Sequence, residues 1–170
     1  MPKRILILLL GLALLPLSAL ARDALEVTLI ADRGGALREY PVERRRDLYR
    51  AYVEARPGAE YGIRVRNRTN DRIGVVIAVD GRNIISGRRS DLRPDERMYV
   101  LGPYESQVYR GWRTGRDRVN RFYFTDAGDS YAAAWGDYSA MGVVAVAVYR
   151  ERPRYRRDSG PEIRQRSESL

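Results

Sequence analysis

Residue types on which many enzymes depend are missing from this chain. Its 170 residues contain no cysteine and no histidine, and Lys3 is the only lysine. Without cysteine there can be no disulfide, so the core must hold without covalent cross-links. The Ser-His-Asp and Cys-His catalytic systems are excluded, as are the usual ligands of zinc, copper and haem iron. Calcium needs six to eight oxygen ligands, and the run DAGDS at residues 126–130 lacks the spacing of an EF-hand loop, so we expect no metal and no cofactor.

Arginine is what the chain has in excess. Lysine and arginine together number 31 against 22 aspartates and glutamates, which gives a net charge of +9. Arginine binds phosphate, sulfate and carboxylate groups in a two-pronged manner that lysine cannot reproduce. A surface of this kind favours an anionic partner.

The N-terminal segment predicts export. Lys3 and Arg4 precede an apolar run over residues 5–17, and Ala19 and Ala21 supply the small residues that a signal peptidase recognises. The apolar run is shorter than the roughly 20 residues that span a bilayer, which favours a signal peptide over an N-terminal membrane anchor. We predict a signal peptide over residues 1–21, a periplasmic or secreted protein, and no transmembrane segment after cleavage.

Periodicity predicts β-strands along most of the remaining chain. In YGIRVRNR (residues 61–68), apolar residues and arginines alternate, so we expect one buried face and one arginine face. Residues 73–79 are apolar on both faces, which predicts a central strand. Asp80-Gly81 then predicts a tight hairpin, because both central residues of the favoured turn need a positive φ. Further strands are predicted over residues 25–30, 36–40, 83–86, 98–101, 105–112, 119–125 and 141–149.

Three details of this pattern are less regular. Residues 42–55 fit either a helix or a strand, and we favour a strand over residues 48–53. Pro41 is expected to end the strand before it. The run MGVVAVAVY over residues 141–149 is almost wholly apolar, which predicts a buried last strand.

Short strands separated by turns, with no clear helix, predict the fold class. Turn signals recur at about 8–12-residue spacing, which favours an antiparallel β-sandwich of about seven to nine strands, with a small β-barrel as the alternative. We assign the sandwich domain to residues 22–150. Residues 151–170 are rich in arginine and poor in apolar residues, which predicts a disordered tail.

The alternating arginines are the candidate functional surface. Arg64, Arg66, Arg68 and Arg72 could bind the phosphates or sulfates of an anionic envelope polymer, of lipopolysaccharide or of a membrane surface. The simpler alternative is a solvated sheet face paired with acids on adjacent strands. An exported protein is not expected to bind nucleic acid. A protein partner is also possible, through an edge strand that pairs with another sheet.

An acidic loop offers an alternative from another class of function. Asp126, Asp129 and Asp137 lie close together in the sequence, and two carboxylates about 5–10 Å apart could hydrolyse an envelope polysaccharide. Aspartates are also common in loops because they form hydrogen bonds with their own backbone. We therefore favour a binding or structural protein over a carboxylate-dependent hydrolase, and we assign no catalytic residue.

Four short motifs resemble those of a group of uncharacterised exported bacterial proteins. They are Arg-Asn-Arg-Thr at residues 66–69, Val-Asp-Gly-x-Asn at 79–83, Gly-Trp-Arg at 111–113 and Ser-Tyr-Ala-Ala at 130–133. The similarity covers residues 61–151. It implies an exported domain and carries over no catalytic residue, because no activity is attached to the group.

Overall fold

The computed structural model describes residues 24–45, 48–115, 118–130 and 136–151, and the predicted signal peptide and residues 152–170 of the predicted tail lie outside them. Within these ranges the chain forms strands and one short 3-10 helix. In chain order they are β1 (Leu25–Ala31), β2 (Glu39–Arg44), β3 (Tyr49–Val53), β4 (Glu60–Asn67), β5 (Ile73–Val79), β6 (Arg82–Asn83), β7 (Tyr99–Leu101), β8 (Ser106–Tyr109), β9 (Gly111–Arg113), β10 (Val119–Tyr123), η2 (Ala127–Asp129) and β11 (Val144–Arg150).

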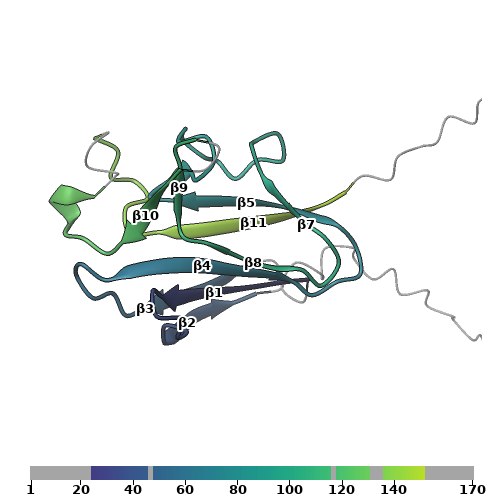
Figure 1. Ribbon diagram of the computed structural model, residues 1–170, viewed down its shortest axis with the longest axis horizontal. Helices are drawn as coiled ribbons and strands as arrows, with labels where there is room; N and C mark the ends of the chain where they lie inside the picture. Colours follow the sequence, from purple (N-terminus) through teal and green to yellow (C-terminus); the bar gives the residue numbers. More distant parts are fainter. Residues whose placement is uncertain (1–23, 46–47, 116–117, 131–135, 152–170) are drawn as a thin grey trace, which may run out of the picture.

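The strands form two stacked antiparallel sheets, which confirms the predicted β-sandwich. The first sheet has the order β1-β4-β10-β9, with β8 also paired to β4, and the second has the order β11-β5-β6, with β7 also paired to β5. Figure 1 shows β5, β7 and β11 of the second sheet above β1, β4 and β8 of the first. Both sheets are open, so the barrel alternative is not the fold.

The core lies between the inner faces of β4 and β5. Ile63 and Val65 on β4 are fully buried, and so is Val75 on β5. These strands run through the centres of their sheets, so each inner side chain has neighbours on every side. Burying a side chain of this size contributes roughly 1.5–3 kcal/mol, and the alternation that the sequence displays follows from it.

The Asp80-Gly81 hairpin is confirmed. Both residues have positive φ, 50° and 72°, and Val79 pairs with Arg82 across the turn. The return strand β6 is only two residues long, whereas the sequence predicted residues 83–86. It ends early because the side-chain oxygen of the buried Asn83 accepts hydrogen bonds from the N–H groups of Ile85 and Ser86, which turns the chain.

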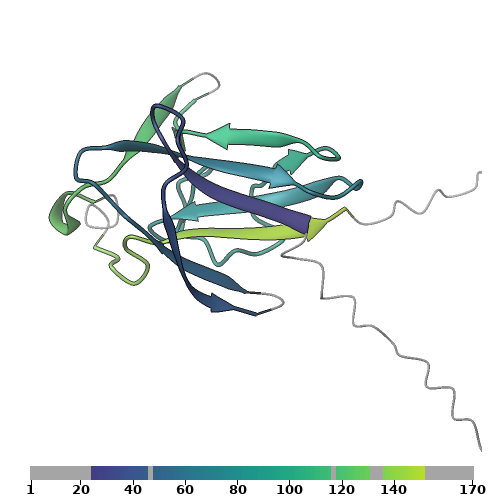
Figure 2. The same cartoon turned by 90° about the horizontal axis from the view of Figure 1, so that it is seen from below.

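A two-stranded hairpin, β2–β3, stands apart from both sheets (Figure 2). The strand predicted over residues 48–53 is confirmed as β3. The prediction that Pro41 ends a strand is wrong, because Pro41 lies inside β2. The β2–β3 register shifts between Pro41 and Glu43. A two-stranded ribbon leaves one side of each strand without a ladder partner, and a proline can occupy such a position.

Two other predictions about strands are corrected. The single strand expected over residues 105–112 is split into β8, which pairs with β4, and β9, which pairs with β10. The last strand, β11, is an edge strand, and Val144–Tyr149 are half-buried instead of buried. It is apolar on both faces because its valines pack against the core and its other face lies beside a long loop.

That loop, residues 84–98, begins with Ile84 in the core, and its later part lies over the outer face of the second sheet. Val76 and Ala78 point outward from β5, yet they are buried. The Met98 side chain lies so close to Gly74 that a β-carbon there would collide with it. On the next strand, the Tyr149 hydroxyl donates a hydrogen bond to the carbonyl of Leu92. Small outward-facing residues on the sheet are what allow the loop to pack so closely.

Candidate anion-binding face

Arg64, Arg66 and Arg68 form a row along the exposed side of β4 and its end; we call these three residues the arginine row. The residues between and beside them, Ile63, Val65 and Asn67, are 0% exposed. Because successive side chains of a strand point to opposite faces, the buried residues hold the arginines outward. Arg64 is half-buried, whereas Arg66 and Arg68 are exposed.

The neighbours of the row are mostly uncharged. Across the ladders, Arg64 pairs with Thr28 on β1 and Val108 on β8. Arg66 pairs with Glu26 on β1 and Ser106 on β8. Glu26 is therefore the one acid directly beside the row in these ladders, and none of the three arginines forms an ion pair within the described ranges.

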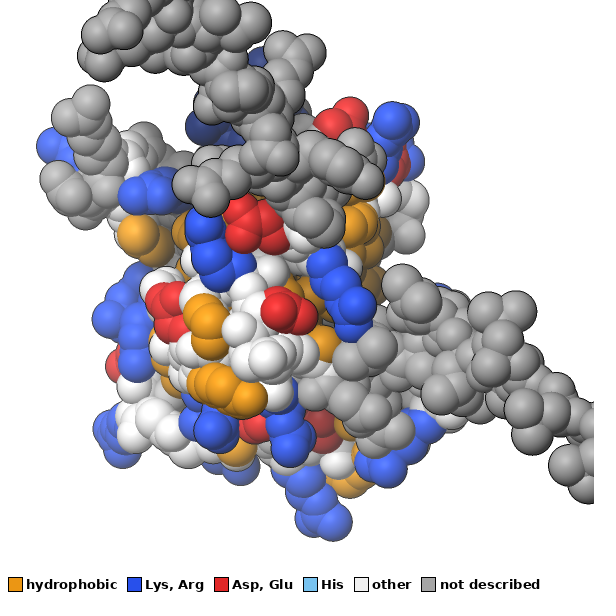
Figure 3. All heavy atoms as spheres, turned by 90° about the vertical axis from the view of Figure 1, so that its right-hand side faces the viewer, with side chains coloured by type: hydrophobic (Ala, Val, Ile, Leu, Met, Phe, Trp, Pro, Cys, Tyr) orange, Lys and Arg blue, Asp and Glu red, His pale blue; other side chains and the backbone are white. Residues whose placement is uncertain are grey.

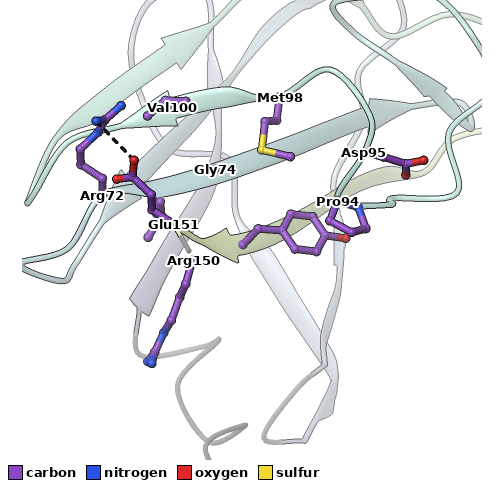
Figure 4. Close-up of a pocket in the computed structure, with 10 residues that line it drawn as sticks. Arg72, Gly74, Pro94, Asp95, Met98, Val100, Arg150 and Glu151 are labelled. Carbon is purple, nitrogen blue, oxygen red and sulfur yellow. Dashed lines mark ion pairs between the residues drawn. The ribbon is translucent and has the colours of Figure 1, made fainter. Parts of the chain in front are cut away.

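Arg72, the fourth predicted residue, lies elsewhere. It directly precedes the first residue of the central strand β5, and its guanidinium lies 3.7 Å from the Glu151 carboxylate. Figure 4 shows this ion pair at one end of a shallow depression lined by Gly74, Met98 and neighbouring residues. The structure therefore brings three of the four predicted arginines together and gives Arg72 a partner of its own.

Two further arginines on the first sheet are neutralised. The Arg121 guanidinium on β10 lies 2.8 Å from the Asp32 carboxylate and also contacts Glu60. Arg110 lies 3.6 Å from the same Asp32 carboxylate. The hydrogen bond to Glu60 raises the pKa of Arg121 above its ordinary value. Sequence reasoning missed this cluster, because its four members are far apart along the chain.

The acidic loop does not form a paired-carboxylate site in the described part of the chain. Asp126 and Asp129 are exposed, and their backbones are joined by a hydrogen bond across η2. Asp137 accepts hydrogen bonds from the hydroxyl and N–H of Ser139 and lies 3.6 Å from Arg89. The bonds from Ser139 lower the pKa of Asp137, the opposite of what a general acid needs.

No group of three or more acids with the geometry of a metal site occurs among the described residues. The depression in Figure 4 holds two acids, Asp95 and Glu151, which lie at opposite ends of it. A second depression is lined by the charged side chains of the 85–97 loop. Figure 3 shows the end of the sandwich at which β1 begins and β11 ends, with basic and acidic side chains intermixed around small hydrophobic patches.

The β2–β3 hairpin carries exposed apolar and aromatic side chains that sequence reasoning did not assign to a site. Tyr52 is 73% exposed and Val42 is 61% exposed. The Arg38 guanidinium lies 5.1 Å from the ring centre of Tyr40, within cation–π range. The sequence does show three tyrosines in this segment, at positions 40, 49 and 52, but the separation of the hairpin from both sheets is a tertiary feature.

Two motif asparagines are structural. Asn67, in Arg-Asn-Arg-Thr, and Asn83, in Val-Asp-Gly-x-Asn, are both buried. The Asn67 amide donates to the carbonyls of Asp71 and Gly102 at 2.7 Å each. The Asn83 amide donates to the Arg97 carbonyl, also at 2.7 Å. Each buried asparagine therefore ties a turn to a distant loop.

A search of the described residues found no helix long and apolar enough to cross a membrane. Comparisons with protein-family models, with curated proteins and with solved structures gave no match.

Proposed function

We propose that this chain is an exported cell-envelope protein that binds an anionic polymer through Arg64, Arg66 and Arg68. The observation that carries the proposal is a contrast on one sheet face. Arg110 and Arg121 are matched by acids, whereas the arginine row has no ion-pair partner among the described residues. Unmatched guanidinium groups held on a rigid strand can engage phosphate or sulfate groups in a two-pronged manner.

The expected ligand is a polyanion with repeated phosphate or sulfate groups, such as lipopolysaccharide or a charged envelope polymer. Adjacent members of the row are two residues apart, so their β-carbons are about 7 Å apart along the strand. A row of this kind suits repeated charges better than a single small anion. The surface is open, so we expect affinity to fall as salt screens the charges.

Retention on a heparin-type column tests the arginine row. Arg64→Ser combined with Arg66→Ser should elute at clearly lower salt than the parent protein, because two unmatched charges are lost. The control combines Arg56→Ser with Arg93→Ser, which removes equal charge from side chains that already have ion-pair partners. Equal elution of the two double variants would mean that net charge alone sets retention, and the proposed site would be wrong.

Export is tested separately by the location and mass of the protein. Expressed from the full chain, it should be recovered outside the cytoplasm, beginning at Arg22. A product that keeps Met1 and stays with the membrane would favour the anchor alternative.

The hydrolase alternative has less support. In the described loop, Asp137 is held by Ser139 and Arg89, and Asp126 and Asp129 are open to solvent. A glycoside hydrolase needs one carboxyl with a raised pKa facing a second across the substrate. Asp129→Asn tests this alternative against a panel of envelope polysaccharides, since turnover that depends on this carboxyl would restore it.

A further inference from the structure

The outer edge of β11 is an exposed strand edge without the usual protection against pairing. β11 pairs with β5 on one side, and its other side has no strand partner among the described residues. Natural sheets protect long exposed edges with charges, prolines or bulges. The segment Val144–Tyr149 has none of the three: it contains no charged residue and no proline, and its ladder with β5 runs without a register shift. We propose that two copies of this chain associate through antiparallel pairing of β11 with β11.

The hydrogen-bonding groups of this edge can be assigned from the ladder. Val79 and Arg82 flank a two-residue turn, so the main-chain groups of Val79 face β6. The N–H and C=O groups of successive residues point to alternate sides of a strand. Those of Ala78 therefore point toward β11 and form hydrogen bonds with the main chain of Ala145, its partner in the ladder. The backbone bond from Asp80 N–H to the Val143 carbonyl, 3.0 Å, fits this assignment.

It follows that Val144, Val146 and Val148 direct their N–H and C=O groups toward the free edge. Their side chains pack against the core, as the partly buried valines of that cluster do. The edge thus presents three donors and three acceptors in a regular row. An antiparallel strand of the same spacing would satisfy all of them.

The sequence of the strand identifies the partner as a second copy. Residues 144–148 read Val-Ala-Val-Ala-Val, the same in both directions. A two-fold axis at Val146 would therefore pair Val146 with itself and Val144 with Val148 of the second copy. Every valine would then face a valine and every alanine an alanine, and the core-facing side of the sheet would continue across the interface.

The ends of the strand are complementary in the same register. Tyr149 would lie opposite Val143 of the second copy, which is 47% exposed in the single chain, and aromatic residues pair well with β-branched ones. Arg150 would lie near the turn that precedes β11 in the second copy, where the Gly142 N–H donates to the Asp80 carboxylate at 2.8 Å. This places a cation of each copy next to an anion of the other.

Cysteine scanning tests both the edge and the register, because the chain has no cysteine of its own. Under mild oxidation of the full-length product, Val146→Cys should form a covalent dimer, since paired strands bring the two Cα atoms within the roughly 4.4–6.8 Å that a disulfide spans. Val148→Cys should not, because its two copies would be about 14 Å apart along the ladder. Combining Val144→Cys with Val148→Cys should restore cross-linking.

Sedimentation of the unmodified protein completes the test, and it should show a dimer that dissociates on dilution. A monomer at every concentration would overturn the proposal. A dimer would also overturn it if Val146→Cys failed to cross-link, or if Val148→Cys cross-linked equally well. These readouts do not depend on anion binding, so this proposal and the proposed function can fail independently.

Discussion

Replacing Asn67 with alanine should remove the polar centre that joins two turns at one end of the sandwich. The Asn67 side chain is 0% exposed and makes four hydrogen bonds. Its oxygen accepts from the N–H and hydroxyl of Thr69, and its amide donates to the carbonyls of Asp71 and Gly102. Alanine can replace none of these bonds, and the vacated space is too enclosed for easy solvation.

The magnitude follows from counting those bonds. A buried hydrogen bond contributes about 1 kcal/mol net, so the loss of four predicts a decrease of about 4 kcal/mol in the free energy of unfolding. Domains of this size are stable by about 5–15 kcal/mol, so the variant would lose a large share of the total. At about 2–4 °C per kcal/mol, the melting temperature should fall by about 8–16 °C.

Urea unfolding followed by tryptophan fluorescence measures this change. The control is Asn70→Ala, three residues along the same turn, where the side chain is exposed. We expect its midpoint to stay within about 0.5 kcal/mol of the parent. If the two variants unfold at the same urea concentration, the hydrogen bonds of Asn67 do not hold the turns together and the reasoning fails.

Three further predictions, two of them with a comparison variant, concern other parts of the sandwich. Tyr109→Phe should leave stability unchanged or raise it by up to about 1 kcal/mol, because the buried Tyr109 hydroxyl has no hydrogen-bond partner within the described structure. Tyr149→Phe should lower stability, because it removes the hydrogen bond to the Leu92 carbonyl. A higher urea midpoint for Tyr149→Phe than for Tyr109→Phe would contradict this prediction. Gly111→Ala should cost about 3 kcal/mol, because a β-carbon would overlap the backbone of β10, while Gly35→Ala, with nothing within 4 Å, serves as the neutral control. Partial burial alone would raise the pKa of Glu96, but hydrogen bonds, including two from backbone N–H groups, lower it below its ordinary 4.5. The contribution of the ionised Glu96 carboxylate to the free energy of unfolding is therefore complete above about pH 4.5 and is lost as the pH falls through the folded-state pKa. In urea titrations, the difference in stability between the parent and Glu96→Gln should narrow over that fall in pH. A difference that does not change with pH would contradict the prediction.

The parts of the fold that could be predicted from the sequence are those set by local periodicity. β4 and β5 appear where alternation and a continuous apolar run place them, and the Asp80-Gly81 turn has the predicted backbone geometry. Each of these features depends on residues within one strand or one turn, so no knowledge of distant neighbours was needed.

The errors arise where distant parts of the chain decide the outcome. An apolar strand is expected to be buried, yet β11 occupies an edge, because the order of strands depends on pairings across the whole chain. Val76 is buried beneath the loop between β6 and β7, and the sequence of β5 alone does not predict that this loop lies over it. Asn83 was recognised as a hairpin residue, but its burial depends on the Arg97 carbonyl, fourteen residues away along the chain.

The candidate site also has one part that the sequence predicted and one part that it could not predict. Alternation predicted that Arg64, Arg66 and Arg68 would share a face, and they do. Sequence alone could not show that Arg72 has Glu151 as a partner, because that contact joins the start of β5 to the end of β11. Which acid lies beside a given arginine depends on the order of the strands in the sheet. The periodicity of the sequence does not determine that order.

The distribution of charges on the first sheet supports the proposal that the arginine row binds an anion. At the spacing of about 7 Å between neighbouring β-carbons of the row, two unit charges in water would repel each other by about 0.6 kcal/mol, so adjacent arginines without acids beside them weaken the fold slightly. Acids at the flanking ladder positions would offset this, yet Thr28, Ser106 and Val108 occupy three of those four positions. Elsewhere on the same face, Asp32 supplies the compensating charge to Arg121. Stability alone would favour the same arrangement beside Arg64, whereas a site that receives an anion from outside requires the open one.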